Sequence, residues 1–315
     1  MRGEGGFALV VTLLVTALLV ALSAEFVNEV YVDTSLSHNF VDGQQASILA
    51  SSGVDGGMAL LKFNLALQPN YTTLADQWAK PLNLEDERGK ITVTIEEESA
   101  KLDLNKMAPA TGDLDSAGFY YATAVALVKK LGLSTDLWDA LADWVDTNDE
   151  PHPGGAESSY YVTLKPPYAA RNAPLDSVEE LGLVKGFTGE VMAKLLPFVT
   201  VYGESSSTMA AAPVNINTAP KELLASLQVG STAMTDSLAE QVIEYRKTTP
   251  FKNPQDLANV PGMGAVAIGL QTYVTTKGSV FRIRSEARVR ETRRVVEAVV
   301  RMSGTTPAVL YWREY

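Results

Sequence analysis

The sequence predicts an α+β protein in which a long N-terminal helix packs on an antiparallel sheet, and an all-helical domain is inserted into that sheet. Three observations support this fold class. Residues 7–22 carry no charged side chain, as expected for an apolar helix. Apolar and polar residues alternate near Ile91 and again near Phe281, which indicates half-buried strands. Between positions 106 and 277 this alternation gives way to short helical patterns.

The first predicted element is a membrane-spanning helix over residues 7–24. Before Ser23 its only polar side chains are those of Thr12 and Thr16, so the apolar stretch just reaches the length that crosses a bilayer. No proline interrupts the chain until Pro69. We therefore expect one helix from residue 7 to about residue 65, on the order of 85–90 Å long at 1.5 Å per residue.

The C-terminal half of this helix is expected to lie on the sheet. Its apolar residues recur at spacings of three and four, which marks one helical face. Three nearby glycines each lower the helix propensity by about 1 kcal/mol and are expected to permit a kink. The face consists of Val54, Met58, Leu61 and Leu65, and the glycines are Gly53, Gly56 and Gly57.

Three interpretations of the N-terminus are open: a cleaved secretory signal with a small-x-small site at residues 21–23, an ordinary membrane anchor, and a prepilin signal. In the third, a short polar leader ends in Gly6, cleavage occurs before Phe7, and the apolar helix stays on the protein. The sequence around Gly6 and Phe7 resembles this third type, which we favour. Val11 is then the fifth mature residue, where most pilin-like subunits carry Glu. It is either an ordinary membrane-helix residue or the mark of a subunit that does not need that Glu.

Two groups of alternating residues predict the sheet. The last two strands are expected to be joined by a turn at residues 290–293. Arginines alternate with Phe281 and Ile283, and we expect them to form a solvated face. The expected strands are residues 91–95 with their continuation at 101–105, then 281–289, 295–301 and an edge strand at 309–312.

Short helices predict the inserted domain. One carries Leu137, Leu141 and Trp144 on a single face, and Ser177 opens a candidate capping box. Residues 204–213 have the composition of a linker. The expected segments are a leader at 1–6, a membrane segment at 7–24, the rest of the helix with the first strands at 25–105, helical parts at 106–212 and 213–277, and the last strands at 278–315.

The composition argues against several classes of function. A net charge of −11 makes nucleic acid and anionic membrane surfaces poor partners. The chain has no cysteine, so an exported form has no disulfide to hold its loops, and a bound metal becomes a candidate staple. The two histidines, His38 and His152, argue against a zinc site or a His-based catalytic triad. No nucleophile with an adjacent base is visible, and we do not expect an enzyme.

An acidic loop after the 137–144 helix is a candidate calcium site. Oxygen-bearing side chains alternate at Asp146 and Asn148, and Glu157 follows a Pro/Gly-rich stretch as a candidate bidentate ligand. The glycine spacing and the twelfth-position Glu of an EF-hand are missing. A solvated acidic loop and a pair of catalytic carboxylates are the alternatives, but clustered carboxylates repel one another unless a cation neutralises them. The expected ligands are Asp143, Asp146, Asn148, Asp149, Glu157 and Asn172.

Residues 261–264 read Pro-Gly-Met-Gly and resemble the turn of a helix-hairpin-helix. Such a turn aims backbone N–H groups at a phosphate, which would make the chain a DNA-binding or DNA-uptake protein. Alternatively, Gly262 and Gly264 supply positive φ and close helix packing. We favour packing, because the first candidate hairpin at residues 227–231 lacks the double glycine and the whole chain is acidic.

Together these motifs resemble the K-type minor pseudopilins of the type II secretion system, the general secretion pathway protein K family, over nearly the whole chain. Each motif is weak alone, and their order makes the resemblance specific. The motifs are Gly6–Phe7 with the apolar run, Val11, and residues 102–105, 143–146, 155–157, 160–161, 167–174 and 214–220.

The resemblance implies a pilin-like fold whose inserted domain is built from SAM-like pieces and binds calcium. It implies a subunit at the tip of a periplasmic pseudopilus, with a single span in the inner membrane, that initiates assembly and aids export of folded proteins. It also implies cleavage and N-methylation at Gly6–Phe7 by a prepilin peptidase. The implied partners are the I- and J-type minor pseudopilins and the major pseudopilin. The leader departs from the family in carrying Glu4 and a single arginine.

Overall fold

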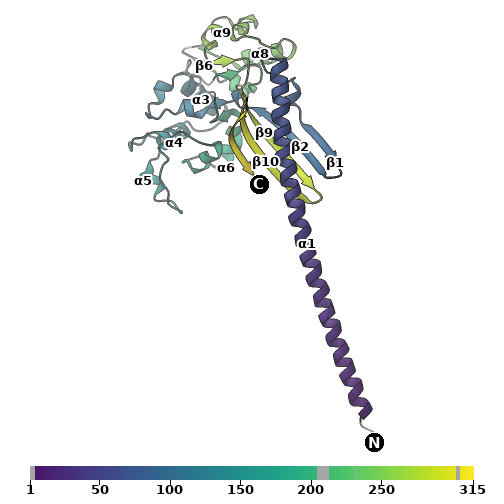
Figure 1. Cartoon of the computed structure of the whole chain (residues 1–315). Helices are drawn as coiled ribbons and strands as arrows, with labels where there is room; N and C mark the ends of the chain where they lie inside the picture. Colours follow the sequence, from purple (N-terminus) through teal and green to yellow (C-terminus); the bar gives the residue numbers. More distant parts are fainter. Residues whose placement is uncertain (1–3, 204–212, 231, 303–305) are drawn as a thin grey trace.

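The computed structural model describes residues 4–203, 213–230, 232–302 and 306–315, and its most prominent element is the helix α1 (Figure 1). This helix runs without interruption from Glu4 to Leu67. Its N-terminal part projects away from the rest of the chain, whereas its C-terminal part lies along the sheet. The single helix expected from residue 7 to about residue 65 is confirmed.

Within the described residues, the main sheet has five antiparallel strands in the order β1-β2-β9-β10-β11. β2 and β9 pair directly, although the whole insertion separates them in sequence. The expected strands at 91–95, 281–289, 295–301 and 309–312 are confirmed, whereas β1 was not predicted. The strands are β1 (Leu82–Asp86), β2 (Gly89–Glu97), β9 (Val280–Val289), β10 (Thr292–Arg301) and β11 (Ala308–Glu314).

Residues 101–105 do not continue the main sheet, so that expectation was wrong. Leu102–Asp103 forms β3, which pairs in parallel with β4 (Val199–Thr200) inside the insertion. The chain then enters α2 (Leu104–Met107), where the Asp103 side chain accepts a hydrogen bond from the backbone N–H of Asn105. The local alternation of apolar residues therefore reflects a buried strand-to-helix turn.

The face of α1 that contains Val54 packs on the sheet, as expected, and Val54 is fully buried. The helix continues without a break through the glycines beside it. An ideal Cβ at Gly53 would lie 2.1 Å from Ser285 Oγ, and one at Gly57 would lie 2.9 Å from Ile283 Cγ2. These two glycines are needed because the helix backbone approaches the sheet closely.

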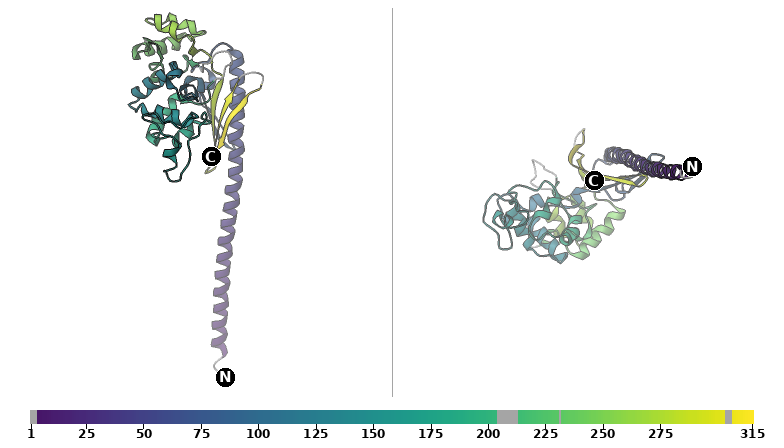
Figure 2. Two further views of the ribbon diagram at one scale, coloured as in Figure 1. Left: turned by 90° about the vertical axis from the view of Figure 1, so that its left-hand side faces the viewer. Right: turned by 90° about the horizontal axis from the view of Figure 1, so that it is seen from below.

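The insertion leaves the sheet after β2, returns at β9, and covers the sheet face opposite α1, so the sheet lies between them (Figure 2). It is mainly helical, as expected, but also holds the short strand pairs β3–β4, β5–β8 and β6–β7. Residues 204–212, where a linker was expected, lie outside the described residues. The further helices are α3 (Phe119–Lys130), α4 (Asp136–Val145), α5 (Ser158–Tyr161), α6 (Gly189–Leu195), α7 (Lys221–Leu224), α8 (Asp236–Thr248) and α9 (Gly264–Leu270), and the strands are β5 (Val214–Asn215), β6 (Gln228–Val229), β7 (Thr232–Ala233) and β8 (Val274–Thr275).

Ser177 does not form the expected capping box. It precedes a 3-10 helix at Val178–Leu183 and makes no side-chain capping hydrogen bond. The Glu180 carboxylate instead accepts a hydrogen bond of 2.9 Å from Trp144 Nε1 and one of 3.1 Å from Arg171 Nη1. Glu180 thus ties this helix to α4.

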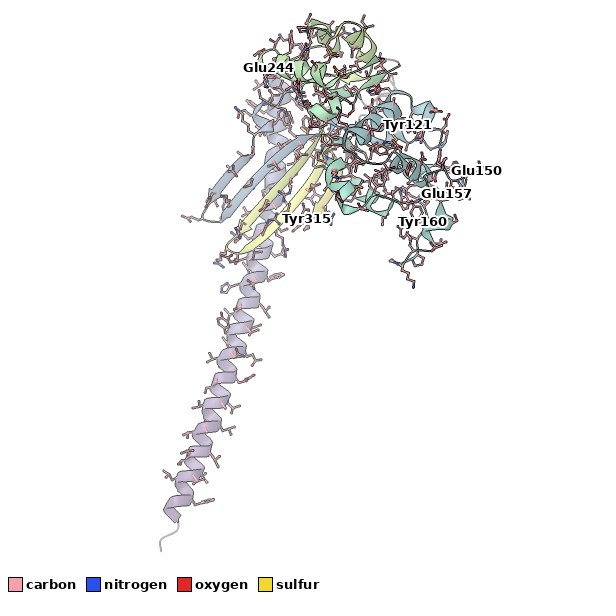
Figure 3. All side chains as sticks on the ribbon, turned by 180° about the vertical axis from the view of Figure 1, so that it is seen from behind. Tyr121, Glu150, Glu157, Tyr160, Glu244 and Tyr315 are labelled. Carbon is pink, nitrogen blue, oxygen red and sulfur yellow. The ribbon has the colours of Figure 1, made fainter. Side chains whose placement is uncertain are left out.

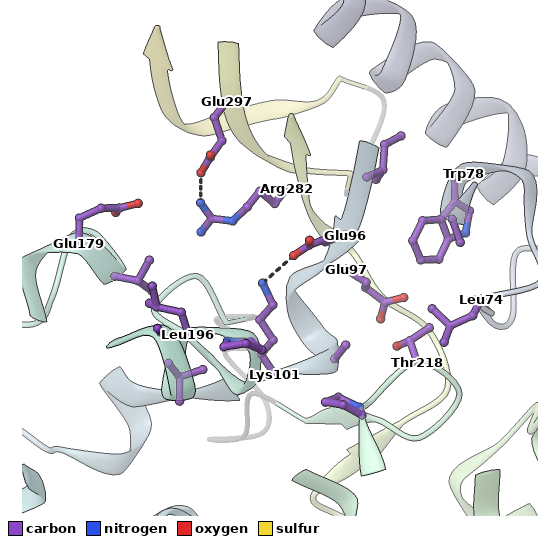
Figure 4. Close-up of a pocket in the computed structure, with 18 residues that line it drawn as sticks. Leu74, Trp78, Glu96, Glu97, Lys101, Glu179, Leu196, Thr218, Arg282 and Glu297 are labelled. Carbon is purple, nitrogen blue, oxygen red and sulfur yellow. Dashed lines mark hydrogen bonds and ion pairs between the residues drawn. The ribbon is translucent and has the colours of Figure 1, made fainter. Parts of the chain in front are cut away.

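Arg282 shows that the arginine-rich face of β9 is not wholly solvated, contrary to expectation. Its Nε donates a 2.8 Å hydrogen bond to Glu98, which is fully buried, and its Nη1 pairs with Glu297 on β10. Arg282 and Glu297 line a cavity of about 720 Å³ between the sheet and the insertion (Figure 4). The outer face of the sheet is therefore an internal polar interface at this end.

A second buried carboxylate, Glu97 at the end of β2, joins the sheet to both ends of the insertion. It accepts hydrogen bonds from Thr72 Oγ1 at 2.8 Å, Ser99 Oγ at 2.7 Å and Asn215 Nδ2 at 2.6 Å. Gly278 passes so close that an ideal Cβ would lie 2.2 Å from the Glu97 carboxyl carbon. We call Glu97 with these four residues the junction.

Candidate functional site

The last turn of α4 places two acidic side chains in the interior of the insertion. Asp143 and Asp146 are both fully buried. Asp146 is the C-cap residue, and its backbone N–H bonds to the carbonyl of Ala142 at 2.9 Å. The remaining α4 side chains from Leu137 onward pack mostly into the apolar core, so the helix end is fixed in position. Two carboxylates consequently sit where little water reaches them.

The loop after α4 folds back onto these carboxylates. Asp146 Oδ1 accepts a 3.1 Å hydrogen bond from the backbone N–H of Asn148, and Asn148 Oδ1 accepts one of 2.7 Å from Glu150 N–H. His152 donates its backbone N–H to Asp143, and His152 Nδ1 lies 2.5 Å from Asp143 Oδ1. The loop thereby returns the chain to Glu157, which is only 2 % exposed.

Four buried oxygen atoms in this region have no hydrogen-bond donor among the described residues. They are Asp146 Oδ2, Glu157 Oε1, Glu157 Oε2 and Asn172 Oδ1. Asn172 has a positive φ of 51°, and its backbone N–H bonds to the Trp144 carbonyl at 2.9 Å, beside the two aspartates. Buried acceptors without donors are rare in folded proteins and call for a partner such as an ion or a water molecule.

Glycines leave the space beside these oxygens open. Gly112 adopts a φ of +72°, and an ideal Cβ there would lie 2.4 Å from Asp146 Oδ2. At Gly155 an ideal Cβ would lie 1.9 Å from Asp143 Oδ2. Any larger residue at either position would occupy the space next to the carboxylates.

The charges in this cluster work against one another. Burial, followed by the charges of Asp143, Asp146 and Asp149, raises the pKa of Glu157 to about 7. Burial and the charge of Asp143 also raise the pKa of Asp146. Burial lowers the pKa of His152, but its hydrogen bond to Asp143 and that group's charge outweigh this effect, so the pKa rises overall. The cluster therefore favours binding a proton or a cation.

A hard divalent cation fits the unpartnered donors better than a soft one. All four atoms are carboxylate or amide oxygens, which calcium prefers, and Glu157 offers both of its oxygens. Asp143, Asp146 and His152 also bring one ligand atom each within 4.8 Å of one another. His152 gives the centre a nitrogen atom that the sequence analysis did not assign to it.

The expected ligands differ in how the fold presents them. Asp143, Asp146 and Glu157 are all buried, and the charges of the two aspartates act on Glu157. Asn172 is linked to the end of α4 through its backbone bond to Trp144. Asn148 is half-buried with its side-chain oxygen bonded to Glu150, and Asp149 is exposed. His152 lies inside the predicted loop but is not among the expected ligands, because calcium prefers oxygen atoms. Ligation by each residue stays a prediction.

α1 begins as a helix that is long and apolar enough to cross a membrane. Its most apolar window has a mean hydropathy of 2.6, and none of that window is buried by the rest of the described chain. Gly6 and Phe7, the expected processing site, both lie within this helix. Val11 is 41 % exposed on the same segment.

The helix-hairpin-helix-like turn packs into the insertion. Gly262 has a φ of +79°, and an ideal Cβ there would lie 3.2 Å from Leu238 Cδ2. Met263 is fully buried, and α9 starts at the next residue. Nearby, Arg246 Nη1 donates inward to the carbonyls of Ile216 and Ala219, each at 2.8 Å. The geometry fits the packing interpretation of the two glycines.

Comparison with known proteins identifies two consecutive matches to family models, both described as type II secretion system protein K, at residues 100–204 and 214–277. The type II secretion system protein K of Aeromonas hydrophila is 27 % identical over 323 residues, covering 95 % of this chain and 93 % of its own. The counterpart from Pseudomonas aeruginosa is 28 % identical over 310 residues, covering 94 % and 88 %.

A solved structure shares the fold. The crystal structure of the GspK–GspI–GspJ complex of enterotoxigenic Escherichia coli contains a chain that matches this one with a TM-score of 0.66 and 21 % identity. The match covers 90 % of this chain and 99 % of the other. The long helix on an antiparallel sheet with a large insertion is thus a known arrangement. The family matches and the curated relatives together show that the chain belongs to the type II secretion system protein K family.

Proposed function

We propose that this chain is the minor pseudopilin at the tip of a type II secretion pseudopilus, where it initiates assembly and aids export of folded proteins across the outer membrane. The observation that carries this proposal is the insertion between the neighbouring strands β2 and β9. It adds a second body to one side of the sheet while α1 occupies the other (Figure 2). Such a body is difficult to repeat along a thin filament, but it can cap one.

The anchor is proposed to remain on the mature protein. The apolar part of α1 has no cover from the described chain, so a membrane or neighbouring helices must cover it. A prepilin peptidase would cut between Gly6 and Phe7 and methylate the new terminus. The apolar N-terminal part of α1 would stay in the inner membrane, and the sheet with its insertion would lie in the periplasm. Mass spectrometry of membrane-extracted protein should show a methylated N-terminus at Phe7. A terminus at Ala24 or Glu25 would instead indicate a cleaved secretory signal.

Val11 supports the tip position through electrostatics. In a filament of related subunits, a fifth-position Glu can neutralise the amino terminus of the subunit assembled before it. An unpaired charge within a membrane costs several kcal/mol. A subunit with no predecessor meets no such amine, and an apolar Val11 carries no cost there. Labelling of assembled filaments should place this chain at one end, and label along the shaft would contradict the proposal.

The partners are proposed to be the I- and J-type minor pseudopilins, with the major pseudopilin below them. The similar solved chain is described in a complex with GspI and GspJ, which supports the same arrangement here. Detergent-extracted full-length chain should co-purify with its own I- and J-type counterparts. As a control for the tip position, a Val11→Glu variant should still bind these partners. Its incorporation throughout the filament would contradict the argument from Val11.

The acidic centre is proposed to bind calcium. Asp146, Glu157 and Asn172 would supply the unpartnered oxygens, with Asp143 beside them. Calcium that binds only the folded state would stabilise it by about 2.7 kcal/mol at a concentration 100-fold above the dissociation constant. Asp146→Ala should remove most of the calcium-dependent shift in melting temperature, whereas Glu150→Gln, at an exposed acid of the same loop, should keep it. Equal melting in calcium and EGTA would leave the loop as a solvated acidic segment.

A further inference from the structure

Residues 158–171 form an excursion from the insertion that we call the tyrosine arm. It begins with α5 and lies far from α1 (Figure 1), and its root is marked by Glu157 with Tyr160 beyond it (Figure 3). The residues immediately before and after the arm are Glu157 and Asn172. These two residues hold three of the four unpartnered buried oxygens that the acidic centre contains among the described residues. The proposed cation centre therefore lies at the base of the arm.

The contacts that now hold the arm are concentrated near its base. Tyr161 is fully buried and stacks on Tyr168, with ring centroids 5.3 Å apart. Tyr161 also packs in a T-shaped arrangement with Trp144, with ring centroids 5.0 Å apart. The two arm ends are linked directly, because Ala170 N–H donates to Ser158 Oγ at 3.0 Å. Further out the arm is open to solvent, and Val162 is 55 % exposed.

The charges at the base oppose these contacts. When the base is closed, Asp146 and Glu157 carry buried oxygens that no donor in the described chain satisfies. A buried polar atom without a partner destabilises the folded state, and a charged one does so more strongly. Opening the base would let water reach these atoms. A divalent cation between them would remove the same cost while the base stays closed.

We infer that the bound cation is a clasp that closes the base of the tyrosine arm, so that the arm is ordered on the insertion only when the ion is present. This inference rests on the proposed calcium site. It adds that the ion orders one segment, residues 158–171, and does not act only on the stability of the whole folded chain. The clasp works because its donors come from both ends of the arm and from the end of α4, namely Glu157, Asn172 and Asp146.

Hydrogen exchange measured by mass spectrometry on the full-length chain in detergent tests the clasp. In EGTA, amides of the arm should exchange at least about tenfold faster than those of α4, because the arm opens on its own. Calcium at 100-fold above its dissociation constant should slow arm exchange by about 100-fold. The paired strands β9 and β10 serve as an internal reference in the same sample.

Two variants separate ligand loss from backbone effects. Asn172→Gly keeps a residue that adopts positive φ freely and removes only the carboxamide. Glu157→Gln keeps the side-chain shape and removes the charge. Both should lose most of the calcium-dependent slowing of the arm, and Glu150→Gln should retain it.

The possible outcomes distinguish the clasp from the metal site itself. If calcium raises the melting temperature but the arm exchanges as slowly as α4 in EGTA, the clasp is wrong and the metal site stands. If Asn172→Gly and Glu157→Gln leave the calcium-dependent slowing of the arm intact, the clasp is wrong and these two residues do not hold the ion. If calcium changes neither the melting temperature nor the hydrogen exchange of the arm, the proposed metal site and the clasp are both wrong.

Discussion

The junction and the acidic loop both bury a glutamate, and they satisfy it in opposite ways. Glu97 at the junction is 3 % exposed, and Glu157 in the loop is 2 % exposed. The Glu97 carboxylate accepts three hydrogen bonds from Thr72, Ser99 and Asn215. Neither oxygen of Glu157 meets a donor in the part of the chain that the structure describes.

This difference separates a structural carboxylate from one that can exchange its partner. Burial raises the pKa of both glutamates, so both ionised forms are disfavoured before any partner is counted. At Glu97 the fold supplies the compensating donors from segments far apart in sequence, and the group fixes the insertion to the sheet. At Glu157 the fold supplies further acids instead. Compensation there must come from a proton or a cation in solution.

The largest effect is expected at the junction. Glu97→Ala would leave the buried Thr72 hydroxyl and one N–H of the Asn215 carboxamide without an acceptor, which costs about 3 kcal/mol of unfolding free energy in total. The loss should be the same in calcium and in EGTA, as measured by chemical unfolding of the detergent-solubilised chain. A calcium-dependent loss would mean that the two centres are coupled and that the contrast drawn between them is wrong.

A matched pair of glycine substitutions probes the two centres with the same change. An added Cβ at Gly278 would lie 2.2 Å from the Glu97 carboxyl carbon, and one at Gly155 would lie 1.9 Å from Asp143 Oδ2. Overpacking of this kind costs about 2 kcal/mol, so Gly278→Ala and Gly155→Ala should destabilise the chain to a similar extent. Only Gly155→Ala should also weaken calcium binding, measured by calorimetry. Unchanged affinity in that variant would place the ion away from Asp143.

The sequence predicted the loop better than the junction because the loop is local. One short stretch of unusual composition contains Asp143, Asp146 and Glu157, and the repulsion between their charges is enough to indicate a cation site. The hydrogen-bond donors to Glu97 lie up to 118 positions away in the sequence, so no local sequence pattern predicts them. His152 was overlooked because its role depends on the loop turning back onto Asp143, which is a property of the fold.

The main elements were predictable for a similar reason. The apolar run of α1 and the alternation of β2, β9 and β10 are periodic patterns that burial on one face imposes directly. Residues 102–105 showed the same alternation, but they are buried inside the insertion and not in the main sheet, a distinction that pattern cannot make. Helix propensity alone predicts that Gly53 and Gly57 weaken the helix. Their role depends on how closely Ser285 and Ile283 approach.

A smaller effect is expected from pH. The pKa of Glu157 is raised from 4.5 to about 7, so between these values the folded chain binds more protons than the unfolded chain. In EGTA, the stabilising contribution of protonated Glu157 is therefore fully present below about pH 4.5 and is lost as pH rises through about 7. The melting temperature of wild type should fall relative to Glu157→Gln over this window. Calcium should remove the difference in slope, because it stabilises the ionised form.

The smallest effect is expected at Asp149, which tests how far the expected ligand set follows the fold. Asp149 belongs to the same acidic run as Asp146, yet its side chain is exposed, and it acts on Glu157 through its charge. Exposed charge interactions are worth about 0.2–1 kcal/mol, so Asp149→Asn should weaken calcium binding by no more than about threefold to fivefold. Glu157→Gln, which changes a buried and unpartnered carboxylate in the same centre, should weaken it more than about tenfold.

Calorimetric titration of both variants at one salt concentration gives this comparison. Repeating it at higher salt should reduce only the Asp149 effect, because salt screens exposed charges. Equal and salt-independent losses would mean that Asp149 binds the ion directly, and that the loop closes around the metal more tightly than its position in the structure indicates.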